Sequence, residues 1–242
     1  MSCCVSNNPI TKPICFDKTK LVLSNIEGHT GNWPFQSKGK ENISMNGQNC
    51  LSKLGYIEAL KYLAKLHSIN VNDKQGLDEE IYGGSSIDEK LNDDYQKLNS
   101  KENKEKLNFI SKYIPKGEDR VYSHGDFKPD NIVLSEIETA NTKKINLSAI
   151  DWIDFGLRQR QYDFGSLLFG ITNLDILNEF LDLYLERSDI YLNDKSKFLK
   201  EAIAMACIVH INAPLFAKEF EMVDAYIEYT YRMIGEINRI IL

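Results

Sequence analysis

The 242-residue sequence predicts an α+β fold in which helices dominate and strands are short. The first observation is a run of apolar residues at helical spacing over 53–68. The second is a pair of short apolar runs, 132–134 and 145–150, which flank the polar segment 135–144 and are expected to pair as a hairpin. The third is the mostly helical patterning of residues 161–242, so one central hairpin is combined with a large helical part.

The first fifty residues predict strands and loops instead of helices. The runs 14–17 and 20–26 indicate two short strands around a turn at Lys18 and Thr19. Residues 28–50 contain four glycines and few apolar side chains. We therefore expect a long irregular segment there.

Two kinds of helix are expected after this segment. Ser52 suits a helix N-cap, and the helix that follows has an apolar face formed by Tyr56, Leu60, Leu63 and His67. The region 87–113 is rich in charged residues and predicts one or two helices that face solvent. Their inner side is expected to carry Leu91, Tyr95 and Leu98.

Composition and charge exclude several classes of protein. Hydrophobic residues make up 43% of the chain, enough for a core, while a net charge of −6 without a basic stripe argues against nucleic-acid binding. The five cysteines are odd in number and form no Cys-x-x-Cys pair, so neither a disulfide framework nor a zinc site is expected. Without an 18-residue apolar run or a signal peptide, the sequence predicts a soluble cytoplasmic protein that contacts no membrane.

The most informative segment runs from His124 to Asn131 and reads His-Gly-Asp-Phe-Lys-Pro-Asp-Asn. An aspartate followed five residues later by an asparagine suits phosphoryl transfer. The carboxylate of Asp126 can face an acceptor hydroxyl, and the amide oxygen of Asn131 can reach a metal on the nucleotide phosphates. Pro129 stiffens the short loop between them, so both side chains are expected to serve one small space.

A second carboxylate is needed to hold magnesium, and Asp151 is the candidate. It directly follows the run 145–150, so the hairpin is expected to place it opposite Asn131. A local alternative is Asp154, because Asp154-Phe-Gly imitates the metal-binding triplet of protein kinases. Asp154 could also contact a second metal or be a plain turn residue, and we prefer Asp151 because it comes immediately after the strand.

These segments resemble the aminoglycoside phosphotransferase and choline kinase family, a branch of the protein-kinase-like fold. The catalytic loop of this family is matched here by His124, Gly125, Asp126 and Asn131. Its metal segment is matched by Ile150-Asp151-Trp152, Gly156 and Tyr162-Asp163. The resemblance implies a kinase-like α+β fold with a mostly helical C-terminal lobe and a catalytic β-hairpin.

The resemblance also implies roles for the loop residues. Asp126 would be the catalytic base, and Lys128 could reach the transferring phosphate. His124 belongs to the same catalytic loop, where its imidazole is expected to bond the backbone and fix the turn. Asn131 and Asp151 would hold Mg2+, with ATP as co-substrate. The carboxylate of Asp163 is expected to accept backbone hydrogen bonds from the catalytic loop.

The segment 20–28 resembles the hinge strand of the family. Its backbone near Ser24, Asn25 and Ile26 would bind adenine. On this reading residues 1–28 are a remnant of the N-terminal lobe and hinge, and residues 29–242 form the C-terminal lobe. The family's five-stranded lobe has too few residues here, so most of it is expected to be missing, and a partner chain could supply it.

The function that these residues predict is ATP-dependent phosphorylation of a hydroxyl on a small molecule of aminoglycoside, choline, ethanolamine or sugar type. Alternatives are a non-catalytic pseudokinase that acts as a binding module, or one fragment of a split kinase. A protein kinase is disfavoured because Gly125 stands where such enzymes usually carry arginine and no Ala-Pro-Glu segment follows.

Several other polar residues are better explained by structure than by chemistry. His67 and His210 lie on apolar helix faces and are expected to be satisfied core histidines. An acidic run and a tyrosine set near the C-terminus could suit an ammonium substrate, but a solvated helix face and core packing are preferred. The acidic residues are Glu219, Glu221, Asp224 and Glu228, and the tyrosines are Tyr226, Tyr229 and Tyr231.

Overall fold

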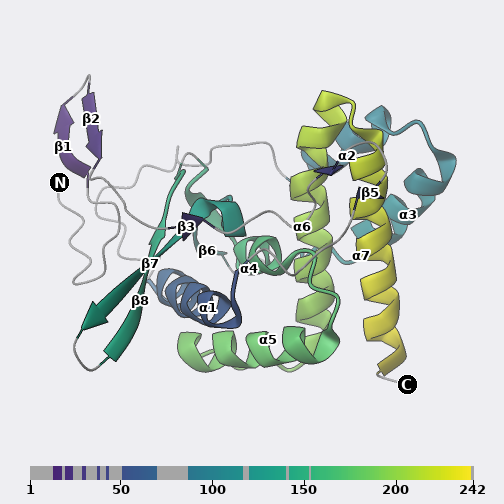
Figure 1. Ribbon diagram of the computed structural model, residues 1–242. Coiled ribbons are helices and arrows are strands. Elements are labelled where there is room, and N and C mark those ends of the chain that lie inside the picture. Colours follow the sequence, from purple (N-terminus) through teal and green to yellow (C-terminus); the bar gives the residue numbers. More distant parts are fainter. Residues whose placement is uncertain are drawn as a thin grey trace.

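The computed structural model (Figure 1) describes the backbone of residues 13–17, 20–23, 29–30, 37–38, 42–43, 51–69, 87–116, 120–139, 142–152 and 154–240. Side chains are described from residue 51 onwards within these ranges, apart from those of 87–90, 136–144 and 240. The proposed hinge residues Ser24, Asn25 and Ile26 lie outside the described residues. The fold is α+β and mostly helical, as the sequence predicts.

The N-terminal strands agree in part with the expectation. Strands β1 (Pro13–Asp17) and β2 (Lys20–Leu23) pair antiparallel, which confirms the predicted hairpin, although β2 ends at Leu23. The segment expected to be irregular contains three two-residue strands: β3 (His29–Thr30), β4 (Ser37–Lys38) and β5 (Asn42–Ile43). The expectation was wrong there because runs this short carry no period that a sequence can reveal.

The central hairpin is longer than predicted. Strands β7 (Ile132–Thr139) and β8 (Thr142–Ala149) pair antiparallel from Ile132↔Ala149 to Thr139↔Thr142. The expected polar excursion at 135–144 was therefore wrong, since most of it continues the two strands. β3 joins the other edge of β7 and completes a three-stranded sheet in the order β3-β7-β8.

A second small sheet connects the strand before the catalytic loop to the strand that begins at Gly156 of the metal segment. Strand β6 (Arg120–Ser123) pairs antiparallel with β9 (Gly156–Gln159), and Ser123 lies opposite Gly156. The catalytic loop starts directly after β6, and β9 begins with Gly156 of the metal segment, five residues after Asp151. Two motifs that are far apart in the sequence are thus fixed against each other by four residue pairs.

Helix α1 (Lys53–His67) begins at the predicted N-cap, where the Ser52 side chain accepts a hydrogen bond from the Gly55 N–H at 3.1 Å. Its predicted apolar face is buried. This face packs on α5 (Leu174–Ser188), where the rings of Tyr56 and Phe180 lie 5.4 Å apart, and it also contacts β6 and β8. The helix therefore lies between α5 and the two sheets (Figure 1).

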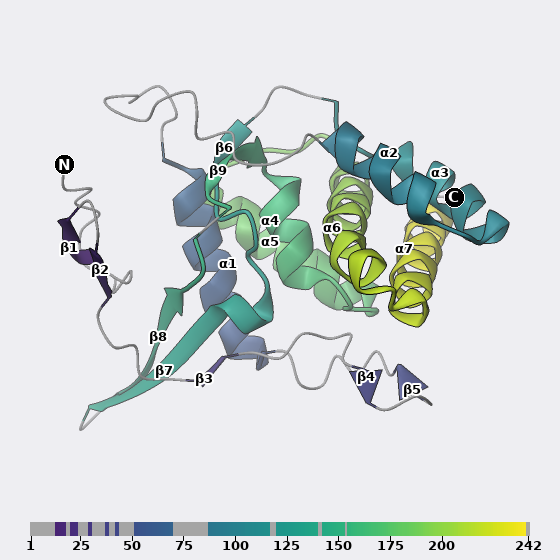
Figure 2. The same ribbon diagram turned by 90° about the horizontal axis from the view of Figure 1, so that it is seen from above.

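The charged region forms two helices, α2 (Ile87–Lys97) and α3 (Lys101–Ser111). They contact α6 (Lys195–Ala217) and α7 (Phe220–Ile240), respectively, and cover the outer side of that pair (Figure 2). Leu98 is buried at the end of α2, while Leu91 and Tyr95 pack against the core from its edge. The prediction of helices with one inner side is confirmed.

The core is centred on α6, which packs against α7 and against the short helix α4 (Gln161–Leu168). α4 and α6 approach closely, since a Cβ added at Gly165 would lie 2.0 Å from the carbonyl oxygen of Ala202. Among the described residues, α6 is the one helix long and apolar enough to cross a membrane. In this fold 72% of its apolar window is buried, as expected for a central core helix.

Candidate active site

The catalytic loop begins at a glycine that the fold requires. Gly125 has a φ of 87°, a conformation that side chains other than glycine rarely adopt. A Cβ there would lie 2.1 Å from the carbonyl oxygen of Asp154. A side chain at this position, such as the arginine of protein kinases, would therefore collide with the backbone of the segment before β9.

The carboxylate of Asp163 anchors the first residues of this loop. It lies in the first turn of α4 and accepts the His124 N–H at 2.6 Å and the Gly125 N–H at 3.0 Å. Burial acts to raise the pKa of Asp163, but its interaction with the His67 imidazole holds it below its ordinary value. The expected backbone hydrogen bonds from the loop to Asp163 are therefore present.

The imidazole of His124 bridges the two motifs. Its Nε2 lies 2.9 Å from the carbonyl oxygen of Ile150, and its Nδ1 accepts the Asp126 N–H at 3.3 Å. These two bonds define a neutral ring that carries its proton on Nε2. Burial lowers the pKa of His124, against the opposing effect of Asp163, which keeps the ring in this form. The side chain bonds backbone on both sides, as expected for a residue that fixes the loop.

Two side chains contact the carboxylate of Asp126. The Nδ2 atom of Asn131 donates to the Asp126 carbonyl oxygen at 2.9 Å and to Oδ2 at 2.7 Å. The Nζ atom of Lys128 lies 2.9 Å from the same Oδ2. The loop between them is the short 3-10 helix Pro129–Asn131, and Asp126 keeps about 20% of its side-chain surface exposed. The sequence-predicted base is thus oriented and reachable.

The two predicted metal ligands come from neighbouring positions of the backbone. The backbone carbonyl oxygen of Asn131 accepts a hydrogen bond from the Ile150 N–H at 3.0 Å. Asp151 is the next residue after Ile150, so it follows the end of the hairpin at which Asn131 lies. Asp151 is exposed and has a φ of 61°. The alternative ligand, Asp154, is exposed in the following turn, and its carbonyl oxygen accepts a hydrogen bond from Arg158 Nη1 at 2.5 Å. The hairpin therefore brings Asp151 to Asn131 as the sequence predicts.

The donor set fits a magnesium ion that arrives with phosphates. The two NH2 hydrogens of Asn131 are directed to Asp126, which leaves the amide oxygen as the cation-facing atom. Within the described ranges, no three His, Cys, Asp or Glu residues gather into a ready metal cage. Mg2+ in nucleotide sites commonly uses one or two carboxylates and completes its shell with phosphates and water, and the side-chain oxygens of Asn131 and Asp151 are of the kind it prefers.

Charge at the site is dominated by aspartates around one lysine. Burial acts to lower the pKa of Lys128, but the hydrogen bond and charge of Asp126, together with Asp130 and Asp151, raise it above its ordinary value. Burial raises the pKa of Asp130, whose carboxylate lies 4.0 Å from Lys128 Nζ. The site is net negative, which favours a metal ion beside the phosphates.

A continuous set of aromatic contacts around this site is absent from the sequence-based predictions. Centroids of successive rings lie between 4.3 and 5.8 Å apart. From α1 to β6 the rings in order are Tyr62, Phe127, His124, Trp152, Phe155 and Tyr122. The feature of the sequence that could have indicated these contacts is that four of the six rings lie in or beside the two motifs.

The other polar residues have structural roles. His67 Nδ1 lies 2.7 Å from the Tyr184 hydroxyl, and His210 Nε2 lies 3.1 Å from the Ser166 hydroxyl, so both are bonded core histidines. The four acidic residues of the C-terminal run are exposed. Tyr226 and Tyr229 are buried, and Tyr231 is 41% exposed. The preference for solvated acids is confirmed, and core packing is confirmed for Tyr226 and Tyr229 but not for Tyr231.

The fold and the two coupled motifs define a kinase-type site for phosphoryl transfer. The model of the phosphotransferase enzyme family matches residues 38–195, well over half of the chain. The chain belongs to this family, as the motifs indicated. No curated protein sequence matches the chain significantly.

Solved structures of similar fold include a Ralstonia eutropha JMP134 protein described as an aminoglycoside phosphotransferase, with a TM-score of 0.55 and 15% identity over 89% of this chain and 73% of that one. The gentamicin complex of APH(2″)-IIa has a TM-score of 0.53 and 18% identity over 96% of this chain and 78% of that one. The choline kinase LicA from Streptococcus pneumoniae has a TM-score of 0.52 and 14% identity over 76% of this chain and 64% of that one. At these identities the likeness shows the fold, which is that of small-molecule kinases.

Proposed function

We propose that this chain is an ATP-dependent small-molecule kinase, which transfers the γ-phosphoryl group of ATP to a hydroxyl of an aminoglycoside, choline, ethanolamine or sugar type of acceptor. Membership in the phosphotransferase enzyme family supports this proposal. The observation that carries it is the Asp126 carboxylate, held by Asn131 and Lys128 in a loop that is hydrogen-bonded to Ile150, the residue before Asp151. The proposed base, the proposed phosphate-binding lysine and the proposed metal ligands thus all come from this loop and the adjoining end of the hairpin.

In the proposed reaction, Asp126 orients the acceptor hydroxyl and accepts its proton. The hydroxyl oxygen forms a bond to the γ-phosphorus while the bond from that phosphorus to the bridging oxygen breaks, and ADP leaves. Asn131 supports this role because its hydrogen bond fixes the Asp126 carboxylate. Such positioning is the main task of the aspartate in this class of reaction.

Lys128 is proposed to steady the transferring phosphate. Its raised pKa keeps the ammonium charged at neutral pH. In the structure it pairs with Asp126, and a phosphate beside that carboxylate would lie within reach of the same flexible side chain. Because the ion pair is partly exposed, its rearrangement costs little.

Magnesium, held by Asn131 and Asp151, would supply positive charge that offsets the charge developing on the phosphates. Adenine is proposed to bond the backbone at Ser24 to Ile26. A cytoplasmic location, where ATP is abundant, is part of the same proposal. The free thiol of Cys207, which is buried in α6, is compatible with it.

The test begins with calorimetry of ATP binding to the purified chain, with and without Mg2+. We expect ATP binding that magnesium strengthens, and we expect this strengthening to be lost in Asp151→Ala. Transfer of labelled phosphate to a panel of hydroxylated amines and sugars follows, with Asp126→Asn expected to reduce the rate by roughly 10²–10⁴-fold. A folded chain that binds no nucleotide would refute the self-sufficient kinase and favour a pseudokinase or a fragment of a split kinase.

A further inference from the structure

Asp151 adopts an unusual backbone conformation. Its φ of 61° lies in the left-handed region, which residues with a side chain seldom occupy. Conformations of this kind persist only where neighbouring contacts hold them. The residue that the proposed function assigns to magnesium therefore requires a restraint, and the surrounding bonds identify it.

Two of these bonds lie on the N-terminal side of Asp151. The Ile150 N–H donates to the Asn131 carbonyl oxygen at 3.0 Å, and the Ile150 carbonyl oxygen accepts the His124 Nε2–H at 2.9 Å. Both end at Ile150, so they fix the chain as it enters the turn. They do not fix the rotation about the backbone of Asp151 itself.

The restraint across Asp151 comes from Trp152. Its indole Nε1–H donates to the Ala149 carbonyl oxygen at 2.9 Å, which closes a ring of covalent and hydrogen bonds that contains the backbone of Asp151. The centroid of the indole also lies 4.3 Å from that of the His124 ring. Moving Asp151 out of the left-handed region would break the indole bond and separate the two rings.

We propose that Trp152 is a positioning residue for the magnesium ligand Asp151, acting through the indole hydrogen bond that holds the left-handed turn. The inference rests on the proposed function for the identity of the ligand. It rests on the geometry alone for the conformational restraint. Trp152 itself contacts neither metal nor nucleotide in this role. It determines where the Asp151 carboxylate points.

The first test is calorimetry of ATP binding to Trp152→Phe, a variant that keeps an aromatic ring and loses the donor. We expect at least tenfold weaker binding in the presence of Mg2+, as for loss of a residue that orients a metal ligand, with ATP binding in the absence of Mg2+ unchanged. Equal weakening with and without Mg2+ would indicate a merely structural role and overturn the proposal. Trp152→Tyr, which also lacks a donor at this place, is the second variant if Trp152→Phe folds poorly.

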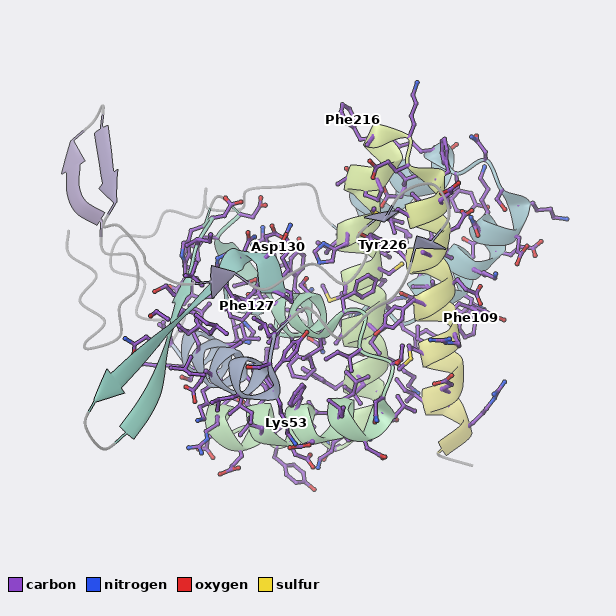
Figure 3. All side chains as sticks on the ribbon, viewed as in Figure 1. Lys53, Phe109, Phe127, Asp130, Phe216 and Tyr226 are labelled. Atoms are coloured by element: carbon purple, nitrogen blue, oxygen red, sulfur yellow. The ribbon has the colours of Figure 1, made fainter. Side chains whose placement is uncertain are left out.

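The matched control is Phe109→Leu. Phe109 contacts the rings of Tyr113 and Tyr231 on the α3–α7 side, far from Phe127 and the catalytic loop (Figure 3). We expect a comparable loss of packing there to leave Mg2+-dependent ATP binding unchanged. If Phe109→Leu weakened binding as much as Trp152→Phe, general destabilisation would explain both and the proposal would fall.

The second test is independent of nucleotide. Asp151→Gly relieves the strain of the left-handed turn and should raise the melting temperature by about 2–4 °C when Trp152 is present. In the Trp152→Phe background the turn can already relax, so the same change should raise the melting temperature less. Equal increases in both backgrounds would refute the restraint. If wild type binds no Mg·ATP, the proposed function fails. The comparison of melting temperatures in the two backgrounds still decides the role of Trp152.

Discussion

The Nε2 atom of His67 lies 3.6 Å from the Oδ2 atom of Asp163, and both side chains are fully buried. His67 ends α1, Asp163 begins α4, and the Tyr184 hydroxyl of α5 contacts the other nitrogen of the imidazole. Since Asp163 also accepts two N–H groups of the catalytic loop, this contact connects the loop to three core helices. The position of the loop is therefore set by the most buried part of the fold.

Removal of the Asp163 carboxylate should destabilise the whole chain. Asp163→Ala leaves two buried loop N–H groups and the His67 imidazole without their acceptor, and we expect a loss of about 3–5 kcal/mol in the free energy of unfolding. Urea denaturation measures the change. Asp175→Ala, which removes an exposed carboxylate from the first turn of α5, should cost about 1 kcal/mol or less. Similar losses in the two variants would contradict this account.

Asp163 also predicts a specific response to acid. Its folded pKa lies below the ordinary value of 3.8, so the unfolded chain takes up the proton first as pH falls. The stabilisation is complete above the ordinary value and is lost as pH falls through the folded pKa. The stability advantage of wild type over Asp163→Asn should therefore shrink on acidification below about pH 4. Urea midpoints measured from neutral to acid pH provide the test, and a constant difference would count against it.

Gly125 should not tolerate a side chain. In Gly125→Ala a Cβ at positive φ would meet the Asp154 carbonyl oxygen, so the loop must shift, at a cost of about 1–3 kcal/mol or more. The control is Gly235→Ala in α7, where a Cβ meets nothing within 4 Å and helix propensity predicts a gain of roughly 0.5–1 kcal/mol. Thermal unfolding of the two variants should shift in opposite directions. A harmless Gly125→Ala would show that the contact with Asp154 is dispensable.

Lys128 should affect turnover more than nucleotide affinity. Lys128→Met keeps the length of the side chain but removes the ammonium that pairs with Asp126, so the proposed kinase should lose roughly 10²-fold in kcat. Steady-state kinetics and ATP calorimetry separate the two effects. Lys101→Met, at a position where 92% of the side chain is exposed on α3, should leave both unchanged. Normal turnover by Lys128→Met would remove this lysine from the proposed mechanism.

The catalytic loop and metal segment could be predicted from the sequence because their chemistry is local. Asp126 and Asn131 are five residues apart, and Asp151 follows a recognisable strand. The first strong helix could also be predicted, since Ser52 and the apolar period mark its start and its buried face. For these parts, spacing along the chain translates directly into geometry.

The outer half of the β7–β8 hairpin could not be predicted. It is rich in polar residues, so no alternation between apolar and polar positions marks a strand there. Its register is visible only in the structure, which places Glu138 opposite Lys143 and Glu136 opposite Ile145. The predicted strands end where the apolar signal ends, although the ladder continues.

The aromatic contacts of the site escaped sequence reasoning for a different reason. Tyr62 lies on α1, Phe127 in the catalytic loop and Trp152 after the metal ligand. Their neighbours in space are set by how β6–β9 and α1 pack, and no spacing in the sequence records that packing. The restraint on Asp151 becomes visible only when these contacts are known.

The length of the β7–β8 ladder makes this chain a promising host for inserted peptides. Asn131 and Asp151 flank the base of the hairpin, whereas Thr139 and Thr142 pair at its far end, roughly 24 Å away along the strands. The hairpin formed by β7 and β8 is seen in Figure 1. Extra residues introduced between Thr139 and Thr142 would leave the register at Ile132 and Ala149 unaltered. An epitope, a fluorophore tag or a dimerising peptide could therefore be displayed there while the phosphoryl-transfer residues keep their places.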